Sequence, residues 1–143
     1  MDLKNKEILD FASLHLNDES DEPMYAENEK GEPDKTKPCN MVIYSPGSRQ
    51  YANASARRNN RNFERLRSNK KQNQSADEQR RESAEFLADC THSAENFIYD
   101  GKVPASREEF IALYSNLKIG YIADQVAKFG AEYANFKKKS ESS

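Results

Sequence analysis

The chain has 143 residues, with 24 acidic side chains against 22 Lys and Arg, so its net charge is −2 and its length suits one domain. No uncharged apolar run approaches the roughly 18 residues of a membrane helix, and the two cysteines, Cys39 and Cys90, form no C-x-x-C motif. We therefore expect a soluble cytosolic protein with free thiols and no membrane partner.

The apolar residues are unevenly distributed along the chain. Leu, Ile, Val and Phe total 24, and 14 of them lie between Ala84 and Phe136. A core forms where apolar side chains are dense, so we expect a core that is mostly C-terminal.

Charge is segregated as well. Residues 1–38 carry a net charge of −6, residues 49–81 carry +7, and residues 82–143 carry −3. A basic middle between acidic flanks suits nucleic acid, an acidic protein partner or the chain's own acidic N-terminus. Compensation within the fold is the simplest of these interpretations.

The N-terminal part predicts an arm followed by a β-hairpin. Residues 1–22 have a mixed apolar pattern cut off by an acidic run, which favours a flexible acidic arm or a short helix. Residues 23–44 predict a hairpin: Pro23–Asn28 as one strand, Glu29–Pro33 as the turn, and Met41–Tyr44 as the second strand. Asp34–Pro38 would be a polar connection without regular structure.

Four helices are expected over residues 49–136. The first follows Ser48, a predicted N-cap, and ends at Asn69–Gln74. The second and third open at capping-box patterns that begin with Ser75 and Ser106, and the second is expected to continue as far as Ala94.

The last predicted helix carries the clearest apolar pattern. Its apolar residues step by three and four positions: Ile119, Ile122, Val126, Phe129, Tyr133 and Phe136. Gly120 and Gly130 each weaken a helix by up to about 1 kcal/mol, so tertiary or partner contacts must stabilise it. The stripe suits either the protein's own core or a partner.

These elements predict an α+β, mainly α fold, in which an N-terminal β-hairpin is followed by about four helices and the C-terminal helices form the core. A single domain would span residues 23–136, and residues 137–143 would form a polar tail.

The sequence gives no reason to expect catalysis, a metal or a cofactor. Cys90 and His92 are the closest Cys and His pair, but residues two apart on a helix point in different directions. A zinc site would have to gather His15, Cys39, Cys90 and His92 from four elements, without the paired spacing of structural sites. The five glycines are isolated, so no phosphate-binding loop is predicted.

The basic 49–71 helix is the feature that favours nucleic acid. Its arginines and lysines would neutralise phosphates, and its asparagines would contact backbone or bases. The chain as a whole is slightly acidic and carries no known nucleic-acid-binding motif, so nucleic acid is the weaker hypothesis.

From Pro23 to Phe136 the chain resembles the tail assembly chaperones of long-tailed (siphovirus- and myovirus-like) bacteriophages. The similarity lies in the order of elements: the turn Asn28–Pro33, the strand Met41–Tyr44, the Arg/Asn-rich helix after Ser48-Arg49-Gln50-Tyr51, and the ending Tyr133-Ala134-Asn135-Phe136. The resemblance implies a non-enzymatic assembly factor without cofactors. Such a factor binds the tape measure protein, keeps it soluble and promotes polymerisation of tail tube protein around it. It acts in the bacterial host cytoplasm and is absent from the mature virion.

Two sets of residues are our candidates for partner contact. Arg57, Arg58, Arg61 and Arg65 form a basic face, and Phe129, Tyr133 and Phe136 form the end of the apolar stripe, where self-association is an alternative use. Two other functions stay open: a nucleic-acid-binding phage accessory protein that uses residues 49–71, and a minor structural protein of the virion.

Overall fold

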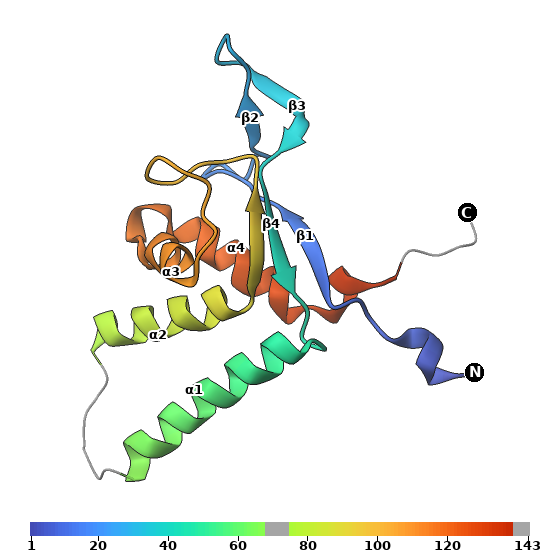
Figure 1. Ribbon diagram of the computed structural model, residues 1–143, viewed down its shortest axis with the longest axis vertical. Helices are drawn as coiled ribbons and strands as arrows, with labels where there is room; N and C mark the ends of the chain where they lie inside the picture. Colours follow the sequence, from blue (N-terminus) through green and yellow to red (C-terminus); the bar gives the residue numbers. More distant parts are fainter. Residues whose placement is uncertain (68–74, 139–143) are drawn as a thin grey trace.

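The computed structural model of the protein describes residues 1–67 and 75–138. These residues form an α+β fold of five strands, four α-helices and three short 3-10 helices (Figure 1). The strands are β1 (Phe11–His15), β2 (Tyr25–Glu27), β3 (Pro33–Pro38), β4 (Asn40–Tyr44) and β5 (Thr91–Glu95). The α-helices are α1 (Arg49–Arg67), α2 (Ala76–Asp89), α3 (Arg107–Ser115) and α4 (Gly120–Ala131). The 3-10 helices are η1 (Leu3–Lys6), η2 (Leu117–Ile119) and η3 (Tyr133–Phe136).

The centre of the fold is a three-stranded antiparallel sheet in the order β1-β4-β5. Met41 and Ile43 of β4 alternate with Val42 and point to the face that the helices cover. Pairing runs from Phe11 opposite Tyr44 on one side, and from Asn40 opposite Glu95 on the other. A strand with neighbours on both edges is buried, which suits the β-branched and apolar residues of β4.

A flexible acidic arm or short helix was expected over residues 1–22. This expectation is wrong for Phe11–His15, which form strand β1. Phe11, Ser13 and His15 lie on one face of this strand, and Ala12 and Leu14 lie on the other. The pattern is too short to separate strand from helix by periodicity, and pairing with β4 decides the outcome. The N-terminal segment is therefore part of the domain.

The hairpin exists, but its second strand differs from the prediction. β2 pairs with β3, so the expected connection Asp34–Pro38 lies within the second strand, and Met41–Tyr44 belongs to the other sheet. The predicted turn is confirmed: Gly31 has φ +76°, and the Asn28 side chain accepts hydrogen bonds from two backbone amides of the turn. A tight turn brings its immediate neighbours together, which favours β3 over the more distant β4. The hairpin projects from one end of the molecule (Figure 1).

The helix starts were predicted well, and two of the ends were not. The Ser48 hydroxyl accepts from the Tyr51 amide, and Ser106 and Glu109 form a complete capping box. However, α2 ends at Asp89 and the chain continues as β5, because pairing with β4 outweighs helix continuation towards Ala94. The predicted end of the first helix at Asn69–Gln74 lies outside the described residues.

The predicted helix over Ile119–Phe136 is also interrupted. Glu132 is extended, with φ −103° and ψ 113°, and it separates α4 from η3. This bend lets the Phe136 ring contact the Phe129 ring, with centroids 5.3 Å apart. The carbonyl of Phe136 accepts a hydrogen bond from the amide of Leu9, which joins the two ends of the described chain.

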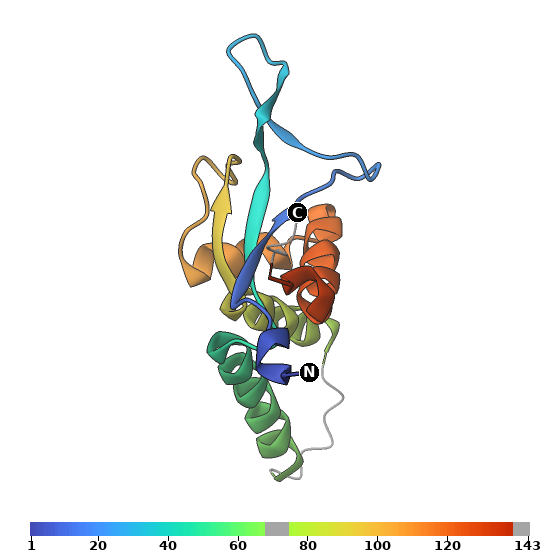
Figure 2. The ribbon, with the colours of Figure 1, turned by 90° about the vertical axis from the view of Figure 1, so that its right-hand side faces the viewer.

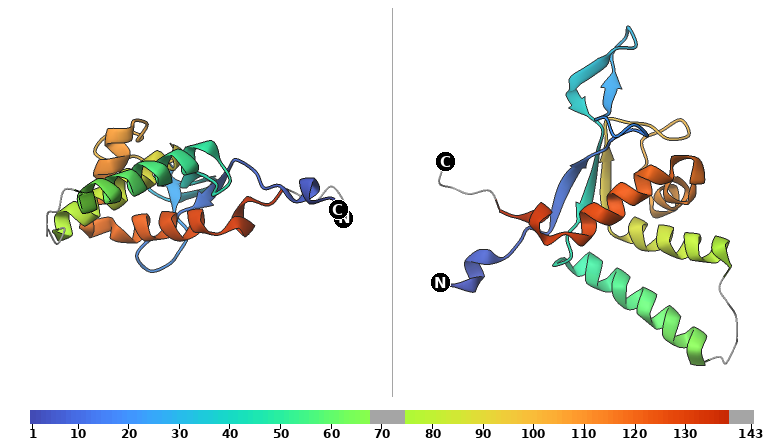
Figure 3. Two further views of the ribbon diagram at one scale, coloured as in Figure 1. Left: turned by 90° about the horizontal axis from the view of Figure 1, so that it is seen from below. Right: turned by 180° about the vertical axis from the view of Figure 1, so that it is seen from behind.

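The core lies between the sheet and the helices. The C-terminal helices supply much of it, as expected, but Leu16, Met41 and Ile43 from the N-terminal half are equally buried. Helix α4 crosses one face of the sheet, as the rear view in Figure 3 and the side view in Figure 2 show. Helix α1 extends away from this core alongside α2. Of the predicted polar tail 137–143, the last five residues lie outside the described part.

Candidate functional site

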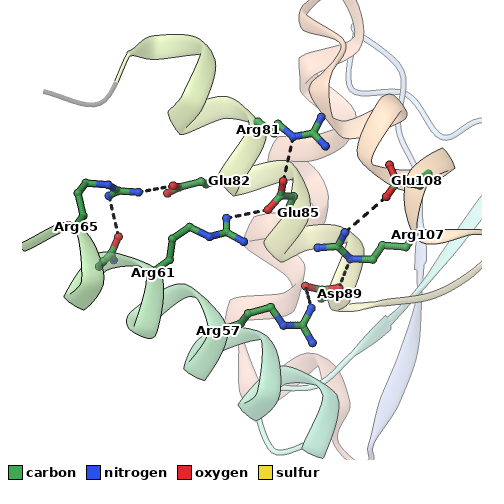
Figure 4. A network of polar contacts seen from close by, with 10 residues as sticks. Arg57, Arg61, Arg65, Arg81, Glu82, Glu85, Asp89, Arg107 and Glu108 are labelled. Carbon is green, nitrogen blue, oxygen red and sulfur yellow. Dashed lines mark hydrogen bonds and ion pairs between the residues drawn. The ribbon is translucent and has the colours of Figure 1, made fainter. Parts of the chain in front are cut away.

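The predicted basic face packs against α2 through a row of ion pairs. Arg57 contacts Asp89 at 2.8 Å, Arg61 contacts Glu85 at 2.8 Å, and Arg65 pairs with Glu82 (Figure 4). The arginines lie four residues apart on α1, and the acids lie three and four apart on α2. Since such spacings place side chains on one face of a helix, two antiparallel helices bring the rows into register.

The carboxylates in this row serve more than one arginine. Asp89 also accepts from Arg107, the first residue of α3, at 2.8 Å, and Glu85 also pairs with Arg81 at 3.1 Å. The hydrogen bond to Asp89 raises the pKa of Arg107 above its ordinary value. Asp89 thus links α1 and α3 through one carboxylate, and three of the four predicted arginines are held in ion pairs within the chain.

Arg58, the fourth predicted arginine, is placed differently. Its guanidinium carbon lies 3.9 Å from the centre of the Phe86 ring, a cation–π contact. It forms no ion pair within residues 1–67 and 75–138. The side chain is exposed, so its charge faces solvent and any partner.

Beside Arg58 lies an apolar groove between α1, α2 and α4, with a volume of about 250 Å³. Ile43, Leu87 and Val126 line it and are buried, so they form its floor. Tyr51 and Arg58 contribute from α1.

The rim of the groove is made of small residues. Ser83 on α2 and Ala127 and Ala131 on α4 line it and are exposed. Gly130 also lines it, and a Cβ there would stand 3.4 Å from Ile43. Small side chains at the rim leave the apolar floor open to an incoming group.

One thiol also lines the groove. Cys90 is 3% exposed, and burial is the main cause that raises the pKa of its thiol to about 12. A thiol with this pKa is neutral near pH 7, so Cys90 acts as an apolar lining residue and is a poor nucleophile.

The three predicted aromatic residues differ in how deeply they are buried. Phe136 is fully buried, so its assignment to partner contact is wrong: it is a core residue. Phe129 is half-buried and packs on Phe136, whereas Tyr133 is 62% exposed. Of this set, Tyr133 presents the largest open surface to a partner, and the stripe as a whole belongs mainly to the core.

Within the described ranges, no group of three or more His, Cys, Asp and Glu side chains is placed to hold a metal ion. Both cysteines are buried and unpaired by disulfides, while His92 is exposed on β5. No helix among these residues is long and apolar enough to cross a membrane.

Sequence reasoning missed the groove and the acidic partners of the arginines. The spacing of the acids could have been recognised in the sequence, since Glu82, Glu85 and Asp89 lie three and four residues apart and therefore share one face of α2. The groove had no comparable signal, because its lining comes from four separate elements.

No protein-family model, curated protein or solved structure matches this chain. Its function is therefore inferred from its own residues.

Proposed function

We propose that this protein is a non-enzymatic phage tail assembly chaperone. It binds the tape measure protein, keeps it soluble and promotes polymerisation of tail tube protein around it, in the host cytoplasm and without remaining in the mature virion. The observation that carries the proposal is the open apolar groove beside Arg58, whose guanidinium has no carboxylate partner in the part of the chain that the structure describes. The resemblance to tail assembly chaperones in the order of elements supports it.

A physical account connects the groove to this role. A very long helical protein exposes apolar stripes until the tube encloses it, and exposed stripes lead to aggregation. A small protein with an open apolar groove covers part of such a stripe by a helix-in-groove contact. Several copies along one client cover more of its stripe, and incoming tube subunits still displace each one.

Exposed apolar residues elsewhere add surface for such contacts. Phe63 and Leu66 on α1 are 61% and 82% exposed, and Tyr133 on η3 is also exposed. Phe63 and Leu66 are three residues apart on α1, so their side chains are neighbours on one face of the helix.

Co-expression with the tape measure protein of the same genome tests the proposal. We expect the tape measure protein to stay in the supernatant and to co-purify with the chain, and to precipitate when the chain is omitted. Tail tube polymerisation, followed by electron microscopy, should accelerate in the presence of both. A tape measure protein that precipitates equally with and without the chain would contradict the proposal.

The nucleic-acid alternative has less support, because three arginines of the basic face already pair with carboxylates on α2. Phosphates would have to compete with these partners. Lys70 and Lys71 of the predicted 49–71 helix lie outside the described residues. The alternative of a minor virion protein is tested by mass spectrometry of purified particles, in which a chaperone should be absent.

A further inference from the structure

The groove between α1, α2 and α4 combines an apolar floor with a cation that forms no ion pair among residues 1–67 and 75–138. The floor comes from three buried apolar residues, and the cation is Arg58, held over Phe86 at the side of the groove. The neighbouring Arg57, Arg61 and Arg65 of α1 each form an ion pair with a carboxylate of α2. The site therefore offers one apolar contact and one positive charge.

The size of the groove restricts its occupant. A volume of about 250 Å³ lies below the roughly 300–1,000 Å³ of pockets for small molecules and cofactors. It suits one large apolar side chain, such as Leu, Met or Phe. The small rim residues Ser83, Ala127 and Ala131 leave room for the backbone that carries this side chain.

We propose that the groove binds an amphipathic helical segment of a partner polypeptide. One large apolar side chain enters the groove, and an Asp or Glu three or four residues away on the segment pairs with Arg58. That spacing places both partner side chains on one face of a helix. This inference rests on the proposed function, and it specifies the kind of client segment that the chaperone recognises.

The chemistry favours a polypeptide over nucleic acid at this site. A nucleic-acid backbone carries no apolar side chain to fill the floor, and its bases bind by stacking on exposed aromatic rings. Here the Phe86 ring is already covered on one face by Arg58. A carboxylate next to an apolar side chain satisfies both parts of the site.

Two matched peptides test the inference on the full chain. The probe is an acetylated helix of about 16 residues, long enough to be helical, with leucines on one face and glutamates three or four residues from them. The control peptide has lysine at every glutamate position. Binding is followed by NMR through the methyl groups of Ile43 and Val126, which line the groove.

We expect saturable shifts of these methyl signals with the Glu peptide and binding at least fivefold weaker with the Lys peptide. Arg58→Ala should weaken the Glu peptide by about two- to fivefold, the range for an exposed ion pair. Ala127→Leu fills the groove and should abolish the saturable shifts, since burying a leucine contributes about ten- to hundredfold. Arg67→Ala, an exposed residue at the end of α1, is the matched control and should leave binding unchanged.

Far-UV circular dichroism checks that each variant is folded, and Ala131→Leu replaces Ala127→Leu if the latter is not. Equal binding of the two peptides would overturn the inference, as would wild-type affinity in the groove-filling variant. Arg58-dependent binding of oligo-dT without binding of the Glu peptide would overturn it in favour of nucleic acid.

The tape measure assay separates this inference from the proposed function. If Ala127→Leu keeps the tape measure protein soluble as well as wild type does, the groove is not the client site and the chaperone function stands. If wild type itself fails in that assay, the proposed function falls whatever the peptides do.

Discussion

Phe136 and Tyr133 lie three residues apart on η3, and their exposures predict opposite consequences of truncation. Phe136 is fully buried, and its ring packs edge-on against Phe129. Tyr133 is 62% exposed. Phe136→Ala and Tyr133→Ala therefore remove rings of similar size from the core and from the surface of the same short helix.

The expected magnitudes follow from the buried area. A buried Phe removes about 200 Å² from water, which at about 25 cal/mol per Å² gives an upper estimate of about 5 kcal/mol. Phe→Ala substitutions in cores cost about 3–5 kcal/mol, so we expect Phe136→Ala to lower the free energy of unfolding by about 4 kcal/mol. The Tyr133 ring loses much less area to the core, and Tyr133→Ala should cost about 1 kcal/mol.

Urea unfolding followed by far-UV circular dichroism measures both effects. With a slope of about 2 kcal/mol per molar urea, the midpoint should fall by about 2 M for Phe136→Ala and about 0.5 M for Tyr133→Ala. Phe136→Leu provides a milder variant if the alanine variant does not fold. Equal shifts for the two alanine variants, or a larger one for Tyr133→Ala, would refute the assignment of Phe136 to the core.

Three further outcomes are expected. Asp89→Asn breaks ion pairs to α1 and α3 and should lower the free energy of unfolding, measured with urea, by about 1 kcal/mol. The effect should be smaller at high salt, because salt screens ion pairs. The control Asp124→Asn, at an exposed position on α4, should change the free energy of unfolding by under about 0.5 kcal/mol. Burial raises the pKa of Cys90 from its ordinary value of 9.0 to about 12, so the folded state keeps the thiol proton to higher pH than the unfolded state. The stability that this group contributes is present below about pH 9 and is lost as the pH rises towards 12. Cys90→Ala should therefore reduce the alkaline loss of stability in a urea series across pH. Ser106→Ala removes the capping box of α3 and should cost about 1 kcal/mol in the same urea assay, and an unchanged midpoint would show that the cap contributes nothing.

Features that depend on neighbouring residues could be predicted from the sequence. The cap at Ser48, the capping box at Ser106 and the turn around Gly31 each involve hydrogen bonds within a few residues, and all three are present. Their determinants are side-chain donors, acceptors and backbone freedom at fixed offsets, which sequence spacing displays directly.

Features that depend on residues far away in the sequence could not be predicted in this way. β1 and β5 are five-residue strands that become strands because both pair with β4, and neither has a distinctive pattern of its own. The break at Glu132 has a similar cause, since it lets Phe136 reach a core that also includes Leu16 and Met41. A strict three-four spacing predicts a continuous helix, and tertiary burial overrides it here.

The candidate site also has one part that the sequence predicts and one part that only the structure shows. The arginines were found from their spacing on one helix, but whether each one is paired within the fold depends on the acids of α2. Only the structure distinguishes Arg58, which has no acidic partner in the described part of the chain, from Arg57 and Arg61 on either side of it.

The proposed site also accounts for weak binding, which the proposed role requires. One buried apolar side chain contributes about 1.5–3 kcal/mol, and one exposed ion pair contributes about 0.2–1 kcal/mol. Together they give about 4 kcal/mol at most, so a single groove binds with a dissociation constant no lower than about 1 mM, since association also costs translational and rotational freedom. A contact this weak is displaced readily by tube subunits. In the proposed role, the ion pairs of Arg57, Arg61 and Arg65 with α2 would keep the affinity low, because four arginines without such partners would hold an acidic client more tightly.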